Sequence, residues 1–287
     1  MFPDIKIAGL VVLYNPEDIV VSNISSCAEQ VEIIFVIDNS PVPNIEIVKR
    51  INKIKALTYI SNGKNEGLAK ALNMGAIKAI EHGYNFLLTM DQDSKPYPDM
   101  VERMLSCFST HDPSTVGIVS PFHMLRNTPH KIKYGYREVL VTMTSGNLLN
   151  LEIYRTVGPF MDELFIDYID HEYCLRLQMN GFKVIEVADA LLEHNLGNIV
   201  TFDFIVHTFA TTNHSPFRRY FMTRNRFYLM NKYKLEFRAY CRHQLIEFFY
   251  ELAHVFFFER QKIMKFRMVL KGYLDYKKNA MGKVVSF

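Results

Sequence analysis

Residues 85–93 read Asn-Phe-Leu-Leu-Thr-Met-Asp-Gln-Asp, an apolar run that ends in two carboxylates around a glutamine. The run predicts a buried strand, so Asp91 and Asp93 would lie at the end of a core strand. Similar β-rich runs occur at residues 6–14, 31–37, 56–61, 116–120 and 183–188. Strands separated by helical stretches at this spacing predict an α/β fold with a mostly parallel, Rossmann-like sheet flanked by helices.

The bulk composition supports one such core. The chain has 287 residues, of which 49% are hydrophobic, and this excludes a disordered or fibrous protein. Its four cysteines show neither CxxC spacing nor the density of a secreted scaffold, so we expect reduced, mostly buried thiols. They are Cys27, Cys107, Cys174 and Cys241.

The location of the protein is predicted from what the sequence lacks. The first fifteen residues carry an early acidic residue and a short apolar run, which indicates a first strand and not a signal peptide. No stretch reaches the roughly 18 apolar residues of a membrane-spanning helix. We expect a cytoplasmic protein, either soluble or peripheral on the inner face of the membrane.

Polar, turn-forming residues follow each of the first four predicted strands. They are Asn15, residues 38–41, residues 61–67 and residues 91–94. Such residues dominate any turn, which is the structural alternative. Four successive loops at the carboxyl ends of parallel strands, where α/β proteins bind ligands, favour a polar ligand site.

A helix is predicted over residues 67–83, because apolar residues recur there at helical spacing and Gly83 provides a stop. It begins directly after the Asn- and Gly-rich loop, so its free amides would face the same site, where they favour phosphate oxygens. No Gly-Lys-Ser/Thr follows the required spacing, which argues against a P-loop NTPase.

Asp91 and Asp93 predict a metal site. Hard oxygen ligands at a strand end suit Mg²⁺ or Mn²⁺, which binds one or two carboxylates together with substrate phosphates. The ion would neutralise charge on a leaving diphosphate. The alternative is an ordinary surface turn. As a neutral imidazole, His194 would complete the coordination sphere, or it is simply one more polar residue.

A second acidic cluster leads into a predicted helix that begins near Asp170 and stops at Asn180-Gly181. Asp170 is either an N-cap or a general base that takes the proton of an attacking hydroxyl. Glu172 either contacts that acceptor or pairs with Arg176 one turn later.

Taken together, these residues resemble the inverting family 2 glycosyltransferases of the GT-A fold, and within them the rhamnosyltransferase-like branch that builds bacterial surface polysaccharides. The matching pieces are Val11-Val-Leu-Tyr-Asn15, Ile37-Asp-Asn-Ser40, Asn62-Gly-Lys-Asn-Glu-Gly67, Leu88-Thr-Met-Asp-Gln-Asp93, Thr144-Ser-Gly-Asn147, Phe165-Ile-Asp-Tyr-Ile-Asp-His-Glu172 and Glu193-His194. Their order and spacing, over about residues 7–200, carry the resemblance.

The resemblance implies a role for each matching residue. Donor-binding residues would be Asn15, Asp38, Asn62, Lys64, Asn65, Gly67, Asp91, Ser145, Gly146 and Asn147. The metal ligands would be Asp91, Asp93 and His194, and the acceptor residues Glu172 and Arg224. Asp170 would be the base in a single in-line displacement that inverts the anomeric carbon. The donor would be a nucleotide sugar, with dTDP-rhamnose favoured and UDP-linked hexoses and galactofuranose left open.

The C-terminal part differs in composition. From Ser215 to Phe287 there are 16 Lys and Arg against 5 Asp and Glu, a net charge of +11, which leaves −8 for the rest. We therefore predict a catalytic domain over residues 1–200 and a basic, aromatic, helical segment over 201–287. That segment either packs on the core or docks on an anionic membrane, where a polyprenyl-diphosphate-linked or glycan acceptor would be found. No nucleic-acid-binding motif accompanies the charge, so we expect no nucleic acid partner.

Three alternatives bound this interpretation. A sugar-phosphate nucleotidyltransferase would carry a Gly-rich signature after the first strand, where Tyr14-Asn15-Pro16 stands instead. A membrane-peripheral scaffold with a degenerate catalytic fold is the non-enzymatic possibility. The processive relatives carry a Gln-x-x-Arg-Trp motif, and this chain has no tryptophan, which favours transfer of one or a few sugars.

Overall fold

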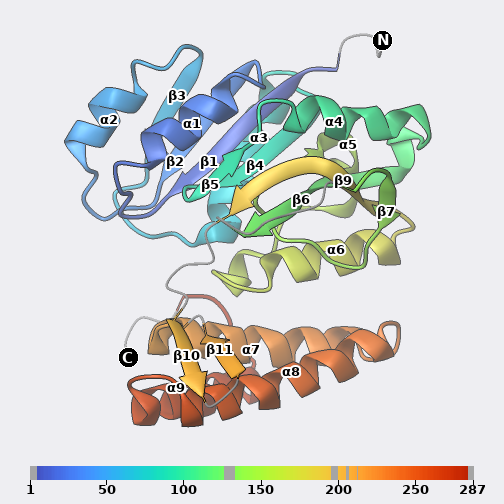
Figure 1. Ribbon diagram of the computed structural model, residues 1–287. Coiled ribbons are helices and arrows are strands. Elements are labelled where there is room, and N and C mark those ends of the chain that lie inside the picture. The colour runs from blue at the N-terminus through green and yellow to red at the C-terminus, as the bar shows by residue number, and fades with distance from the viewer. Residues whose placement is uncertain (1–4, 126–132, 195–199, 205–206, 212, 284–287) are drawn as a thin grey trace. The chain divides into compact units, whose positions relative to one another are not determined.

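The computed structural model describes residues 5–125, 133–194, 200–204, 207–211 and 213–283. The chain forms two compact units (Figure 1). The sheet unit comprises Met1–Asp162 and Ile169–Asn195, and the helical unit comprises Glu163–Tyr168 and Leu196–Phe287. The predicted division at residue 200 lies close to the last of these boundaries, but it did not include the short excursion of residues 163–168 into the helical unit.

Among the described residues, one sheet has the strand order β3-β2-β1-β4-β8-β6-β9-β5, with β7 paired to β9. Its strands are β1 (Ile7–Leu13), β2 (Ile33–Asp38), β3 (Leu57–Ser61), β4 (Phe86–Asp91), β5 (Ser94–Pro96), β6 (Val116–Leu125), β7 (Tyr136–Glu138), β8 (Asn147–Asn150) and β9 (Lys183–His194). The predicted parallel arrangement holds for β1 to β4. The other half is mixed, because β8 is antiparallel to both β4 and β6, and β5 and β7 are antiparallel to β9.

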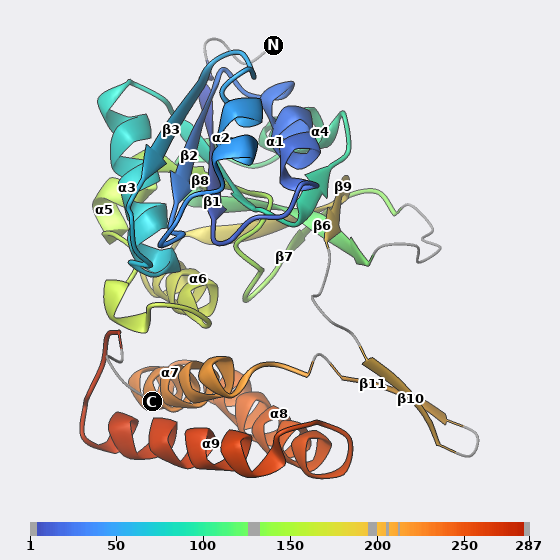
Figure 2. The same ribbon diagram turned by 90° about the vertical axis from the view of Figure 1, so that its left-hand side faces the viewer.

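Helices cover both faces of the sheet. On one side lie α1 (Val20–Ala28), α2 (Ile45–Ile51) and α4 (Met100–Ser106), and on the other α3 (Leu68–Glu81), α5 (Leu151–Val157) and α6 (Ile169–Met179) (Figure 2). Short 3-10 turns span Cys107–Ser109, Pro113–Thr115 and Asp162–Leu164. Helix α1 shows why this packing forms, since Val20, Ile24 and Cys27 recur at helical spacing and are buried in the core. All four cysteines are buried free thiols, as predicted.

The helical unit contains α7 (Pro216–Tyr233), α8 (Arg238–Phe257) and α9 (Lys262–Lys277). Helix α7 starts at an N-cap, where the Ser215 hydroxyl accepts the amide of Arg218, and Pro216 occupies the first turn, where no amide donor is needed. The prediction of helices was correct for this part, but β10 (Val200–Phe204) and β11 (His207–Thr211) form an antiparallel pair that it missed. Within the described residues, no helix combines the length and hydropathy needed to cross a bilayer.

Several basic residues of the helical unit are buried in ion pairs. Arg219 contacts both Glu251 and Glu259, and Lys265 contacts Glu259 at 2.7 Å. Glu259, Arg219 and Lys265 are all buried, so these charges compensate one another inside the unit. Some basic residues of this part of the chain therefore have a structural role and are not available on its surface.

Helix α9 approaches α7 most closely at Gly272. A Cβ atom there would lie 2.5 Å from the carbonyl oxygen of Tyr220 and 3.3 Å from the amide nitrogen of Arg224, both backbone atoms of α7. Because backbone cannot move aside as a flexible side chain can, glycine is needed here for the two helices to meet.

We predict that Gly272→Ala lowers the free energy of unfolding of the chain by about 1–3 kcal/mol, because overpacking forces the helices apart. Urea unfolding followed by circular dichroism measures the change. Arg267→Ala on the exposed part of the same helix is the control and should change stability by less than about 0.5 kcal/mol. Equal effects of the two substitutions would contradict the close approach.

Candidate active site

The carboxyl ends of β1, β2, β3 and β4 lie at one edge of the sheet. Asp38, the last residue of β2, pairs in register with Leu13 on one side and Ser61 on the other, and Asp91 of β4 pairs with Val12. The four polar loops that the sequence singled out therefore start from the same edge, as predicted. This is the position at which parallel α/β sheets bind ligands.

The loop after β1 is bonded to the two strands beside it. Asn15 has a positive φ of 45°, and its amide donates to the hydroxyl of Ser40 at 2.8 Å. The side chain of Gln92 accepts the amide of Tyr14 at 2.8 Å and donates to its carbonyl at 3.2 Å. The middle residue of the Asp-Gln-Asp triplet therefore connects β4 to the end of β1, while the side chain of Asn15 is left exposed.

Asp38 is fully buried, and both its carboxylate oxygens have protein partners. Oδ1 accepts the amide of Ser40 at 2.8 Å, and Oδ2 accepts the hydroxyl of Tyr59 at 2.7 Å. Burial and the hydrogen bond to Asp38 raise the pKa of Tyr59 above its usual value. Asp38 thus shapes the loop that follows β2, and its contact with a nucleoside stays a prediction.

The loop after β3 is held onto the loop after β2 by amide side chains. Asn39 accepts from Asn62 Nδ2 at 2.8 Å and donates to the carbonyl of Gly67 at 3.0 Å. Asn65 Oδ1 accepts the amide of Gly67 at 2.9 Å. Gly67 has φ 92° and precedes the first residue of α3, so this network aims the amino end of α3 toward the carboxyl edge of the sheet.

Lys64 lies at the exposed tip of the same loop. Its ammonium group contacts Glu66, which also pairs with Lys70 at 2.9 Å. Hydrogen bonds from Lys64 and then Lys70 lower the pKa of Glu66 to about 2. Lys64 is therefore positioned by a carboxylate in this structure, near the start of α3.

The two carboxylates of the triplet are half-buried at the end of β4. The backbone amide of Asp91 donates to the hydroxyl of Ser145 at 3.0 Å, and that hydroxyl donates to Ser94 at 2.8 Å. Ser145 and Ser94 are fully buried. Ser145 therefore fixes the turn that carries Asp91 and Asp93, which is a more specific role than lining a pocket.

Gly146 and Asn147, which follow Ser145, also pack and bond beside the end of β4. Gly146 has φ 84°, and a Cβ atom there would lie 2.6 Å from Pro121 and 2.8 Å from Leu192, so only glycine allows the close approach. Its amide donates to the carbonyl of Thr89. Asn147 is buried at the start of β8, with its Nδ2 donating to the carbonyl of Met143.

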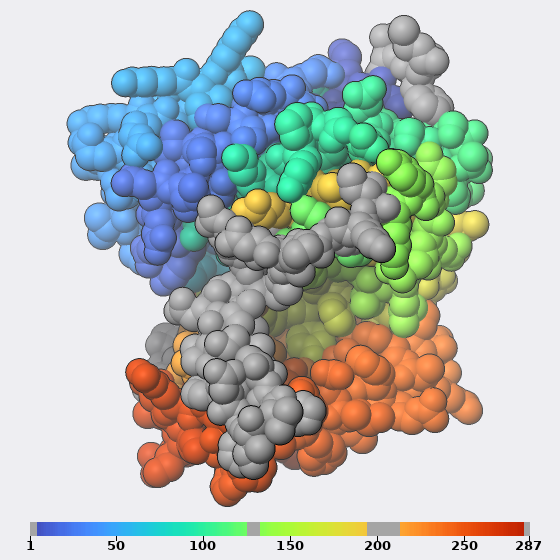
Figure 3. Space-filling model, viewed as in Figure 1, coloured from blue at the N-terminus to red at the C-terminus, as the bar shows by residue number. Residues whose placement is uncertain are grey.

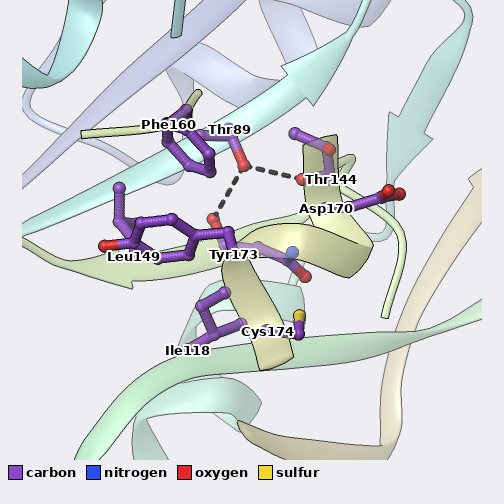
Figure 4. A pocket seen from close by; sticks show the side chains of 9 residues that line it. Thr89, Ile118, Thr144, Leu149, Phe160, Asp170, Tyr173 and Cys174 are labelled. Atoms are coloured by element: carbon purple, nitrogen blue, oxygen red, sulfur yellow. Dashed lines mark hydrogen bonds between the residues drawn. The ribbon is translucent and has the colours of Figure 1, made fainter. Parts of the chain in front are cut away.

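Asp170 lies in the first turn of α6 and lines a small pocket (Figure 4). The pocket is lined by Thr89, Ile118, Thr144, Asn147, Leu149, Phe160, Asp170, Tyr173 and Cys174. Thr89 is two residues from Asp91, and Thr144 and Asn147 flank Ser145-Gly146. The structure thus brings Asp170 to the region that supports the triplet.

Two buried polar atoms of this pocket lack a hydrogen-bond partner among the described residues. They are Asn147 Oδ1 and the hydroxyl of Tyr173. Burial raises the pKa of the Tyr173 hydroxyl, which keeps it protonated. Buried polar groups are normally satisfied by protein or by ordered water, and this pocket is large enough for one water molecule at most.

Two predicted acceptor residues have other roles. Glu172 is fully buried and bonded to Arg176, whose guanidinium also donates to the carbonyls of Val157 and Pro159. Arg224 is equally buried, in the helical unit, and donates to the carbonyls of Glu163, Leu164 and Gly282. Both side chains are 0% exposed, and their contact with an acceptor stays a prediction.

The residues of the predicted metal site are described in part. His194 ends β9 and pairs in register with Ser94, the residue after Asp93, but its side chain lies outside the described residues. Among the residues described, no three His, Cys, Asp or Glu side chains gather to hold an ion by themselves. Asp91 and Asp93 nevertheless fit Mg²⁺ or Mn²⁺, which takes one or two carboxylates and completes its shell with phosphate oxygens and water.

Comparisons with known proteins agree with this geometry. The profile described as glycosyl transferase family 2 matches residues 10–165. The dTDP-rhamnosyl transferase RfbF of Shigella flexneri is 31% identical over 249 residues, which cover 79% of this chain and 80% of that protein.

Two solved structures share the fold. TarS 1-349 of S. aureus in complex with UDP-GlcNAc has a TM-score of 0.63 and 14% identity, over 94% of this chain and 80% of that chain. GalNAc-T7 with UDP, GalNAc and Mn²⁺ has a TM-score of 0.55 and 14% identity, over 66% of this chain and 43% of that chain. At such identities the likeness concerns the GT-A fold alone.

We predict a pH-dependent role for Glu66 in stability. The pKa of its carboxyl is lowered on folding, so its contribution is present above the unfolded value near 4.5 and is lost as the pH falls toward 2. Glu66→Gln should therefore destabilise the protein at pH 7 and 5, and less so at pH 3, as measured by urea unfolding. Glu46→Gln, in the exposed pair with Lys49, is the control. A constant difference down to pH 3 would contradict the prediction.

Proposed function

This chain belongs to glycosyl transferase family 2, and from that premise we propose that it transfers a rhamnosyl group from dTDP-rhamnose to a hydroxyl of a glycan or lipid-linked acceptor. The proposal of dTDP-rhamnose as the donor rests on the 31% identity to a dTDP-rhamnosyl transferase over 79% of the chain. The convergence of four polar loops at one sheet edge supports a site for the nucleotide part of such a donor.

The nucleotide sugar would lie across this edge. Asn15 and the loop after Asp38 would hold the nucleoside, and the amino end of α3 beside Gly67 would face the diphosphate. Helix amino ends favour phosphate oxygens because their amides are free and the helix dipole is positive there. Lys64 would exchange its contact with Glu66 for the diphosphate when the donor binds.

Asp91 and Asp93 would hold Mn²⁺ or Mg²⁺ together with the donor diphosphate, with His194 as a further candidate ligand. The ion would supply charge neutralisation for the departing dTDP. What the chain itself contributes is the fixed turn, because the Ser145 hydroxyl holds the Asp91 amide at 3.0 Å and Gln92 ties the triplet to β1.

Asp170 would act as the general base. Its Oδ1 accepts the amide of His171 at 2.8 Å, which orients the carboxylate. In the proposed step, the acceptor hydroxyl attacks the anomeric carbon, its proton passes to Asp170, and the bond from that carbon to the diphosphate oxygen breaks. Attack from the side opposite the leaving group inverts the configuration at this carbon.

We predict that dTDP-rhamnose raises the melting temperature of the chain more than UDP-linked hexoses or UDP-galactofuranose do, in the presence of Mn²⁺ or Mg²⁺. Asp93→Ala should remove the metal-dependent part of this shift. Asp170→Asn should keep it and lower transfer by roughly 10²- to 10⁴-fold, because only the base is lost.

Each variant is the control for the other, because Asp93→Ala should remove metal-dependent donor binding and Asp170→Asn should remove only the transfer step. Retained transfer in Asp170→Asn would exclude this carboxylate as the base. A larger shift with a UDP-linked sugar would replace dTDP-rhamnose as the donor while leaving the transferase assignment in place.

The helical unit would place the enzyme on an anionic membrane, where a polyprenyl-diphosphate-linked acceptor would be found. Large apolar side chains are exposed around the turn between α8 and α9, with Phe257 at 65% and Ile263 at 74% of full exposure. Exposed Arg260 and Lys262 stand between them. Figure 3 shows part of the surface that this unit contributes (orange to red). Basic residues attract anionic headgroups and apolar ones insert shallowly.

We predict that Phe257→Ser with Ile263→Ser lowers retention of the full chain on vesicles that contain anionic lipid, because shallow insertion is lost. Cosedimentation measures retention. Leu235→Ser, at a side chain that is 68% exposed before α8, is the control and should bind like the wild type. Equal retention of all three proteins would refute docking through this turn.

A further inference from the structure

The backbone of Glu163–Tyr168 is unusual. Phe165, Asp167 and Tyr168 have φ values of 65°, 62° and 66°, a left-handed conformation that side chains with a Cβ rarely adopt. Three such residues within four positions persist only where the surroundings force them, and strain of this kind gathers at functional sites. Asp170, the proposed base, follows two residues later.

Asn225 of α7 holds this backbone in place. Its Nδ2 group donates to the carbonyls of Leu164, Ile166 and Asp167 at 2.9, 2.8 and 2.9 Å. Asn225 is fully buried, so the three carbonyls have this amide in place of water. One small side chain thus bonds the backbone on both sides of Phe165 and the carbonyl of Asp167, another strained residue.

Arg224 holds the start of the same segment. Its NH2 group donates to the carbonyls of Glu163 and Leu164, and its Nε donates to Asn225 Oδ1 at 3.0 Å. Within the described residues, no carboxylate forms an ion pair with this buried guanidinium, which lies over the rings of Tyr220 and Phe221. Burying a charge to bond backbone carbonyls contributes little to stability by itself, so this arrangement favours a role in geometry.

The residues that come just before this segment are bonded to α3. Asn73 of α3 donates to the carbonyl of Phe160 and to Asp162 Oδ1, and accepts the amide of Phe160. These contacts lie within the sheet unit. The segment from Phe160 to Tyr168 is therefore fixed first by an amide of α3 and then by an amide and a guanidinium of α7, directly before Asp170.

We propose that Arg224 and Asn225 are positioning residues for transfer: by holding Glu163–Tyr168 in its strained conformation, they set the start of α6 and hence the position of the Asp170 carboxylate. This rests on the proposed function of Asp170. The link is the chain itself, because Tyr168 is followed directly by Ile169, the first residue of α6. Tyr168 adds to the hold, since its hydroxyl donates to Gln244 at 2.7 Å and accepts from Arg226.

The test is Asn225→Asp, which keeps the size of the side chain and removes the amide donor. Turnover at saturating substrate should fall roughly 10- to 100-fold, the loss that a misplacement of about 1 Å brings. Donor affinity and the number of donor sites per chain should match the wild type, because the proposed donor loops follow β1 to β4 and lie outside Glu163–Tyr168. Asn231→Asp, an exposed residue of the same helix that accepts from Lys234, is the matched control.

Arg224→Lys is the second variant. It keeps the buried charge and loses the fork that reaches two carbonyls, so it should also lower turnover with donor binding intact. Wild-type turnover per donor site in both variants would overturn the proposal. Loss of donor sites together with transfer in both would overturn it too, because the pair would then only maintain the fold. Absence of transfer by the wild-type chain would instead sink the proposed function.

Discussion

The parallel pairing of β1 to β4 is the constraint on which the rest of the site depends. Because Leu13, Asp38 and Ser61 share one register and Asp91 pairs with Val12, the residues that follow these strands must emerge at the same edge. Parallel strands need a crossover, and α1, α2 and α3 provide it. One of these crossovers, α3, begins at this edge, so the same constraint that gathers the polar loops also brings a helix amino end to them.

Several polar side chains at this edge, of the kinds that could bind a ligand, instead form hydrogen bonds with other residues of the edge. Asp38 bonds to Tyr59 and Ser40, Gln92 bonds to the backbone of Tyr14, and Ser145 bonds to the amide of Asp91. Buried polar groups must be satisfied, and here they satisfy one another. The backbone that carries Asp91 and Asp93 is therefore held by hydrogen bonds from Ser145 and Gln92, and such fixed backbone is the kind of preorganisation that catalysis uses.

The path of the chain passes between the two compact units three times. The chain leaves the sheet unit after Asp162, returns at Ile169, and leaves again after Asn195. The short excursion is stabilised by polar groups of α7 and ends just before Asp170. Three of the six residues of Glu163–Tyr168 have left-handed φ values, so the surroundings must define this connection more strictly than a surface loop with ordinary backbone.

The sequence by itself determined the α/β class, the first four strands, α3, and the set of loops from which the site is built, because apolar periodicity and turn chemistry are local properties. It also marked Asp91, Asp93 and Asp170. It did not determine β5, β7 and β8, which are short and gain their stability from neighbouring strands. Nor did it show that Arg224 is buried, or decide whether Glu172 pairs with Arg176. Only the tertiary structure decided that both are buried and bonded to protein, because burial depends on residues distant in sequence, such as the carbonyls of Glu163 and Leu164 that Arg224 meets across about 60 residues of chain.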